Sequence, residues 1–162
     1  MINYFTELIY NSVFIAAAAS WFVAQVVKGI IGSVKAGRFR IGYFLEGGGF
    51  PSGHSATVTG LTLMSGLSYG FDSPVFAVSF FFACVVIFDA QGVRAETGRQ
   101  SRFLNRLYQE HPELLPDVSD EERERLNEGT YFEEHIGHTI KEIVAGVIVG
   151  VIVAVLLSLV LN

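Results

Sequence analysis

Two histidines stand where polar loops give way to apolar segments, and their surroundings suit phosphate chemistry. His54 lies in the glycine-rich run Gly47 to Ala56, and His138 lies in the short run Gly-His-Thr that begins at residue 137. Helix starts carry unpaired backbone N–H groups and a partial positive charge, so they attract phosphate. Phosphoryl transfer through a phospho-histidine needs one imidazole as nucleophile and a second group that protonates the leaving oxygen. The pair predicts that chemistry if the fold brings both rings together.

The composition indicates that a lipid bilayer surrounds much of the chain. Of its 162 residues, 51% are hydrophobic, and a mean hydropathy of +0.44 is high for a soluble protein of this size. The net charge of −5 comes mostly from an acidic patch, Glu110 to Glu134, so nucleic acid is not an expected partner. The single cysteine, Cys84, lies inside an apolar run, so no disulfide framework is available. We expect a single integral membrane domain, residues 1–162.

Apolar stretches predict an all-α membrane bundle of about four transmembrane helices. The expected spans are residues 8–31, 54–71, 73–92 and 138–161. The first contains 20 uncharged residues, Leu8 to Val27, which form about 30 Å of helix and cross the bilayer once. The second and third are short and should pair as a helical hairpin. A polar insert, residues 93–137, follows, and within it Glu96 to Tyr108 has the spacing of an amphipathic helix.

This order of spans places both histidines on one face of the membrane. The first and third spans end there, the second and fourth begin there, and all 11 Lys and Arg residues fall on that face or its margin. By the positive-inside rule the face is cytoplasmic. We therefore expect an integral cell membrane protein whose site faces the cytoplasm, with both termini and the turn Gly70 to Pro74 outside.

The motif around His54 resembles that of a known family of phosphatases. Pro51-Ser52-Gly53-His54 is similar to the central motif of the type 2 phosphatidic acid phosphatases, which share an active-site plan with bacterial acid phosphatases and vanadium haloperoxidases. The similarity is closer to the divergent branch that is described as acid phosphatase/vanadium haloperoxidase-related. Three further blocks carry it: Ala24-Gln25-Val26-Val27-Lys28, Asp89 to Arg94, and Gly137-His138 with Glu142. Together the blocks span Ala24 to Gly150, nearly the whole chain.

The resemblance implies a role for each matching residue. His138 would be the nucleophile, and Glu142, one helical turn further on, would hold its other ring nitrogen. His54 would be the general acid that protonates the departing lipid alkoxide. The other matching residues would bind the phosphate oxygens or neutralise their charge: Lys28, Arg38, Ser52, Gly53 and Arg94. Such a site requires no metal and no other cofactor.

The chain departs from the parent family at two cationic positions. The parent pattern places Arg-Pro seven residues after the lysine, where this chain has Lys35. Arg38 is therefore the chosen phosphate ligand, and Arg40 is its alternative. The parent pattern also places an arginine six residues before the second histidine, where this chain has Phe132. That role would pass to Arg94, which lies on another helix.

Asp89 is a carboxylate near the end of an apolar helix, where an unpaired charge is costly. We expect it to pair with Arg94 or Lys28 and so to position Arg94. The alternatives are a proton acceptor or a metal ligand. Four spans also enclose the site less completely than the six that are usual in the parent family, so a homodimer could complete it.

The leading interpretation is an integral membrane phosphatase that removes a terminal phosphate monoester from a lipid. Phosphatidylglycerophosphate is attractive because its head group with two phosphates suits a site with several cations, while phosphatidate and polyprenyl phosphates remain open. The alternative is a non-catalytic membrane module that binds anionic lipid or phosphate in the same pocket. Haloperoxidation on bound vanadate would use a similar pocket, but the hydrophobic spans argue against it.

Overall fold

Short polar side chains define where the main helices begin in the computed structural model, which describes residues 4–45, 49–111, 114, 119, 132 and 137–161. Asn11 accepts hydrogen bonds from the backbone N–H groups of the first turn of α2 (Ser12–Ala36). Ser52 does the same for α4 (Gly53–Tyr69), and Ser73 for α5 (Pro74–Gln91). Serine and asparagine are preferred at this position because their oxygens satisfy N–H groups that have no partner within the helix.

The described elements are all helices, as the apolar stretches predicted. Besides α2, α4 and α5 they are α1 (Tyr4–Ile9), α3 (Gly42–Leu45), α6 (Val93–Glu110) and α8 (Ile140–Leu161). The stretch predicted as the first span is divided at Asn11 into α1 and α2, and the predicted amphipathic helix forms α6. Most of the acidic patch, residues 110–134, lies outside the described residues.

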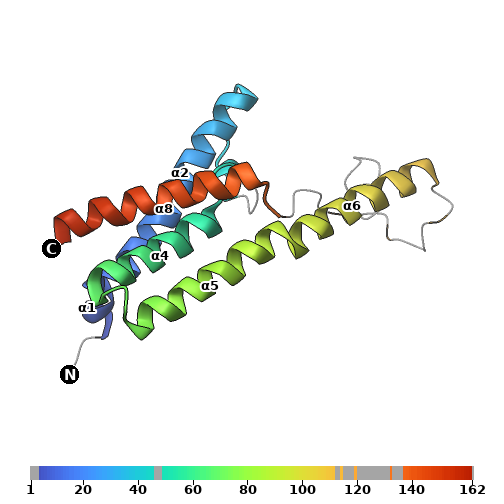
Figure 1. The fold of residues 1–162 in the computed structure, drawn as a ribbon. Helices are drawn as coiled ribbons and strands as arrows, with labels where there is room; N and C mark the ends of the chain where they lie inside the picture. Colours follow the sequence, from blue (N-terminus) through green and yellow to red (C-terminus); the bar gives the residue numbers. More distant parts are fainter. Residues whose placement is uncertain are drawn as a thin grey trace.

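The short helix α4 occupies the centre of the bundle, packed against α2, α5 and α8 (Figure 1). Glycines allow this close packing. A Cβ atom at Gly146 would lie 2.4 Å from the carbonyl oxygen of Ser52, and one at Gly150 would lie 2.5 Å from that of Ala56. Helices α4 and α8 therefore meet backbone to backbone, which is the kind of contact that the spacing of Gly146 and Gly150 favours.

The expected helical membrane bundle is confirmed. Among the described residues, three helices are long and apolar enough to cross a bilayer, whereas about four were expected. They are Ser12–Ala36, Pro74–Glu110 and Ile140–Leu161. The second of these runs through α5 and α6, which Figure 1 shows nearly in line. The stretch predicted as a span at residues 54–71 forms α4, which has 17 residues and is rich in buried glycine, serine and threonine. Its low hydropathy reflects packing against protein on several sides.

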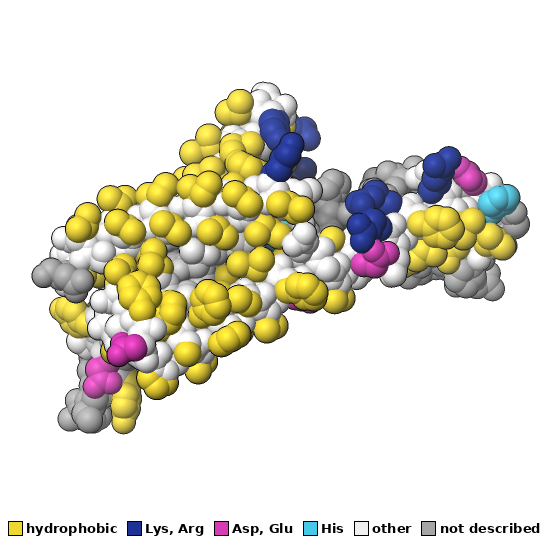
Figure 2. All heavy atoms as spheres, in the orientation of Figure 1, with side chains coloured by type: hydrophobic (Ala, Val, Ile, Leu, Met, Phe, Trp, Pro, Cys, Tyr) yellow, Lys and Arg dark blue, Asp and Glu magenta, His cyan; other side chains and the backbone are white. Residues whose placement is uncertain are grey.

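The bundle has two distinct ends. Helix α1, the C-terminal end of α8 and the turn between α4 and α5 lie together at one end (Figure 1). The start of α4, the end of α5 and the start of α8 lie at the other end. Hydrophobic side chains cover the visible flank of the bundle, whereas Lys and Arg side chains gather toward this second end and along α6 (Figure 2). The side of the membrane that each end faces remains a prediction.

Candidate phosphate site

His138 precedes α8, and its backbone is fixed against α5 and α6. Its N–H group donates to the carbonyl oxygen of Ala90 at 3.0 Å. The preceding Gly137 has φ +91, and a Cβ atom there would lie 2.4 Å from the backbone nitrogen of Ala95. Both the dihedral angle and the close approach call for glycine. The His138 side chain is consequently held in a buried position, with 6% of the residue exposed.

Glu142 joins the start of α8 to the His138 ring. Thr139 and Glu142 form a reciprocal capping box, in which the Thr139 N–H donates to Glu142 Oε2 at 2.8 Å and the Glu142 N–H donates to Thr139 Oγ1 at 3.3 Å. The same Oε2 atom lies 3.4 Å from His138 Nδ1. This contact is an ion-pair distance that falls outside hydrogen-bond geometry, and Nδ1 has no hydrogen-bond partner among the described residues. A small ring rotation would bring Nδ1–H onto the carboxylate.

His54 lies in the first turn of α4, beside His138. The centroids of the two rings are 5.7 Å apart, with an angle of 56° between the ring planes. The backbone explains this proximity, because the N–H group of Ser52 donates to the carbonyl oxygen of Glu142 at 3.0 Å. That hydrogen bond ties the start of α4 to the start of α8. The structure thus brings together the two rings that are 84 positions apart in the chain.

Two cationic side chains act on this pair. Lys28 on α2 is buried, with 5% of the residue exposed, and its aliphatic stem lies next to Gly49. Arg94 lies at the start of α6, where its Nε donates to Asp89 Oδ2 at 2.7 Å. The charges of Arg94, Lys28 and Asp89 all act on His54. The ion pair expected between Asp89 and Arg94 is therefore present, and it holds the guanidinium near the histidines.

Three other predicted phosphate ligands have different surroundings from those expected. Ser52 is fully buried, and its Oγ accepts hydrogen bonds from the Ser55 N–H at 3.3 Å and the Ser55 hydroxyl at 3.1 Å. Gly53 faces α2, where a Cβ atom would lie 3.7 Å from Gln25 Oε1. Arg38 is exposed in the segment after α2, and no described contact joins it to either histidine. In this structure Ser52 caps α4, and Gly53 lies against α2 at ordinary contact distance.

The environment of His138 favours its neutral form. Burial lowers the pKa of His138 below the usual 6.5, and the nearby His54 and Lys28 act in the same direction. The Glu142 carboxylate opposes this effect and raises the pKa, but burial outweighs it. A neutral imidazole has a free lone pair, which a nucleophile needs.

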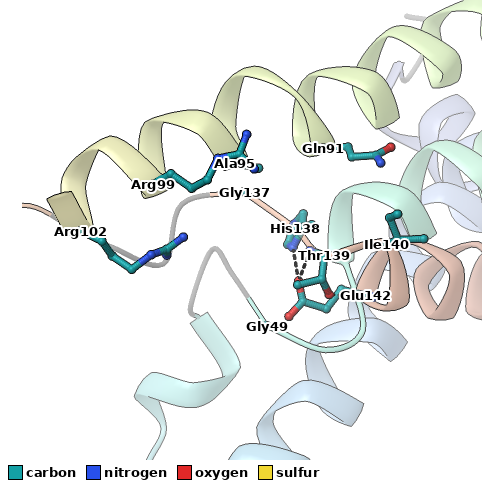
Figure 3. A pocket seen from close by; sticks show the side chains of 10 residues that line it. All are labelled: Gly49, Gln91, Ala95, Arg99, Arg102, Gly137, His138, Thr139, Ile140 and Glu142. Carbon is teal, nitrogen blue, oxygen red and sulfur yellow. Dashed lines mark hydrogen bonds and ion pairs between the residues drawn. The ribbon is translucent and has the colours of Figure 1, made fainter.

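A cavity of about 460 Å³ opens beside His138 and contains two arginines that sequence analysis did not select. Figure 3 shows Arg99 and Arg102 on α6, together with Ala95, across the cavity from His138 and Glu142. The sequence does indicate that these residues share a helix face, since Ala95, Arg99 and Arg102 have the spacing of one side of a helix. Their relation to His138 depends on how the chain returns from α6 to α8, which the local pattern does not reveal.

Within the described part of the chain, no group of three or more His, Cys, Asp or Glu side chains is placed to hold a metal ion. The donors near the two histidines are instead arranged as single ion pairs. Asp89 faces Arg94, and Glu142 faces His138.

These features define a class of protein: a helical membrane bundle in which two imidazoles, a carboxylate and buried or paired cations meet at the starts of adjacent helices. The chain belongs to the Divergent PAP2 family, whose model matches residues 9–153. It is similar to the "Uncharacterized membrane protein YuiD" of Bacillus subtilis (strain 168), with 33% identity over 144 residues that cover 86% of this chain and 89% of the relative. No solved structure matches the chain. The family resemblance predicted from the four sequence blocks is confirmed.

Proposed function

We propose that this protein is a membrane phosphatase that removes a phosphate monoester from a lipid through a phospho-histidine intermediate, without a metal ion. The observation that carries the proposal is the distance of 5.7 Å between the ring centroids of His54 and His138. At that distance both rings can contact one phosphoryl group. Membership of a family related to phosphatases supports the same chemistry.

His138 is the nucleophile in this proposal. Its Nδ1 atom faces Glu142, so the Nε2 lone pair is the one that attacks phosphorus. Attack forms the N–P bond as the bond between phosphorus and the lipid oxygen breaks. The imidazole gains positive charge in this step, and the Glu142 carboxylate stabilises it while holding the Nδ1–H tautomer.

His54 provides the proton for the leaving group. In its protonated form it donates to the departing lipid alkoxide, and in its neutral form it then accepts a proton from the water that attacks the phospho-histidine. The second step cleaves the N–P bond, releases inorganic phosphate and restores both rings. A bound phosphate is anionic, so it favours the protonated form of His54 that the first step needs.

Lys28 and Arg94 stabilise the negative charge on the phosphoryl oxygens. Both charges act on His54, and Lys28 also acts on His138. Preorganised cations of this kind contribute most where burial lowers the local dielectric constant, as it does around Lys28. We further propose that the site faces the cytoplasm and receives its substrate from that leaflet.

The test is metal-free release of inorganic phosphate from a panel of lipid phosphates by the purified protein in detergent micelles. His138→Ala should abolish release, and His54→Ala should lower it by about 10²- to 10⁴-fold. His111→Ala is the matched control, because His111 is exposed at the end of α6. Undiminished release by His138→Ala would refute the mechanism. If the wild-type protein binds lipid phosphates without hydrolysing any of them, the non-catalytic alternative holds.

A further inference from the structure

One face of α6 lines the cavity beside His138. Ala95, Arg99 and Arg102 contribute to its wall, at the positions i, i+4 and i+7 of a helix. The opposite wall includes His138 and Glu142. Figure 3 shows both arginine side chains on the cavity side of α6, while Ala95 lies closest to Gly137. The two guanidinium groups and the proposed nucleophile therefore share one space.

Contacts with the chain that precedes His138 fix this face of α6. The Asn105 side chain donates to the Phe132 carbonyl oxygen at 2.9 Å and accepts from the Phe132 N–H at 2.9 Å. The Tyr108 ring stacks on the Phe132 ring with centroids 6.2 Å apart. At the other end, Gly137 lies directly against the backbone of Ala95. Contacts on both sides of the arginines thus set their position relative to His138.

The charges in this cavity favour an anion. Arg99 pairs with Glu96, but both side chains are more than half exposed, so the pair is weak and guanidinium N–H groups remain for a ligand. Among the described residues that line the cavity, the only carboxylate is that of Glu142, which is already engaged by the Thr139 N–H and by His138. Arg102 adds a second positive charge three positions beyond Arg99.

The spacing along α6 separates these arginines from the reacting phosphate. With a rise of about 1.5 Å per residue, Arg99 and Arg102 lie about 6 Å and about 10 Å along the helix from Ala95, which abuts the residue before His138. A single phosphate held between His54 and His138 does not extend across this distance. A head group with a second phosphate on a short polyol linker does.

We propose that Arg99 and Arg102 form a second anion subsite, which selects lipids whose head group carries a further phosphate beside the one that is removed. This inference rests on the proposed function, because it names the substrate class of the same site. Guanidinium groups suit this task because they bind phosphate through paired N–H donors. Glycerol-linked bisphosphate lipids are the substrate class that the spacing fits.

The experiment compares two short-chain lipids with identical acyl groups, dioctanoyl phosphatidylglycerophosphate and dioctanoyl phosphatidate. The measured quantity is the ratio of their kcat/KM values for the wild-type protein and for Arg99→Gln, Arg102→Gln and the double variant. The control is Arg106→Gln, since Arg106 lies on the same helix but pairs with Glu110 at the exposed surface. Equilibrium binding of both lipids is measured in the His138→Ala background, in which neither lipid should be consumed.

We expect the wild-type ratio to favour the bisphosphate lipid and to fall by about tenfold or more in each single variant, through KM, because each loses a charged hydrogen-bond donor. Arg106→Gln should keep the ratio within about twofold. Ratios that stay at the wild-type value in the double variant would overturn the proposal, as would a wild-type ratio without preference. If the wild-type protein hydrolyses neither these two lipids nor any other lipid phosphate of the panel, the proposed function fails, and the binding preference alone then decides whether the subsite exists.

Discussion

Replacing Glu142 with glutamine separates the chemistry at His138 from the folding of α8. Glutamine fits the same capping box with Thr139, so the start of the helix should be preserved. The negative charge 3.4 Å from His138 Nδ1 is lost. An amide can also donate a hydrogen bond to Nδ1. Such a bond would favour the Nε2–H tautomer and so block Nε2, the nucleophilic nitrogen.

The size of the effect follows from that distance. Two unit charges 3.4 Å apart attract each other by about 5 kcal/mol at an effective dielectric constant of about 20. Only part of a unit charge develops on the imidazole in the transition state, so the carboxylate contributes less than this ceiling. We expect Glu142→Gln to lower kcat by about 10²- to 10³-fold, or about 3–4 kcal/mol. The free energy of unfolding should change by less than about 0.5 kcal/mol.

The pH dependence gives an independent check on the same variant. The nucleophile must be neutral, so kcat/KM should fall as the pH drops through the pKa of His138, which burial places below 6.5. Glu142 raises that pKa, so its replacement by glutamine should move the acid limb of the profile to lower pH. If Glu142 acted only by supporting the fold, its replacement would leave the acid limb at the same pH.

The assay is lipid phosphate hydrolysis from pH 4 to about 9, with thermal unfolding in the same detergent. Glu142→Ala serves as the comparison, because it removes both the charge and the cap and should also cost about 0.5–2 kcal/mol of stability. Wild-type kcat in Glu142→Gln, or an acid limb that moves to higher pH, would refute the role given to this carboxylate.

Two further substitutions test the positioning of the site. Asp89→Asn should reduce kcat/KM at least tenfold by freeing Arg94, yet change the thermal midpoint little because both side chains are about half exposed. Equal losses of stability and activity would contradict this. Gly146→Ala should destabilise the bundle by about 1–3 kcal/mol in thermal unfolding, since its new methyl group would meet the carbonyl oxygen of Ser52. The control Ile148→Ala, on the exposed face of α8, should cost clearly less, and equal costs would disprove close packing there.

Hydropathy predicted the helices well where a long apolar stretch is bounded by polar residues. The expected spans at 73–92 and 138–161 correspond to α5 (Pro74–Gln91) and α8 (Ile140–Leu161). Both have long apolar stretches and clear polar boundaries, so local sequence determines them. Whether the stretch at 54–71 spans the membrane was harder to predict from hydropathy. A helix that is enclosed by other helices needs neither the length nor the hydropathy of one that faces lipid. Its many small residues indicate contact with other helices.

The site was predictable in part, since motif residues that lie at helix starts come together when those helices are neighbours. His54, His138, Lys28, Arg94 and Asp89 meet in this way. Arg99 and Arg102 were missed because they enter the cavity through contacts between α6 and the chain before His138, which are distant in sequence. A capping serine and a phosphate-binding serine have the same local pattern, so the sequence did not reveal that Ser52 caps α4; its role toward phosphate stays a prediction.

The central claim is a covalent bond between phosphate and His138, and it can be tested by trapping the intermediate. His54→Ala protein should be mixed with phosphatidate, quenched in base during turnover and analysed by mass spectrometry of its peptides. The account predicts phosphate on His138 and its absence from the His138→Ala variant. Hydrolysis of the lipid with phosphate on another residue, or with no phosphorylated protein at any time of quenching, would contradict it.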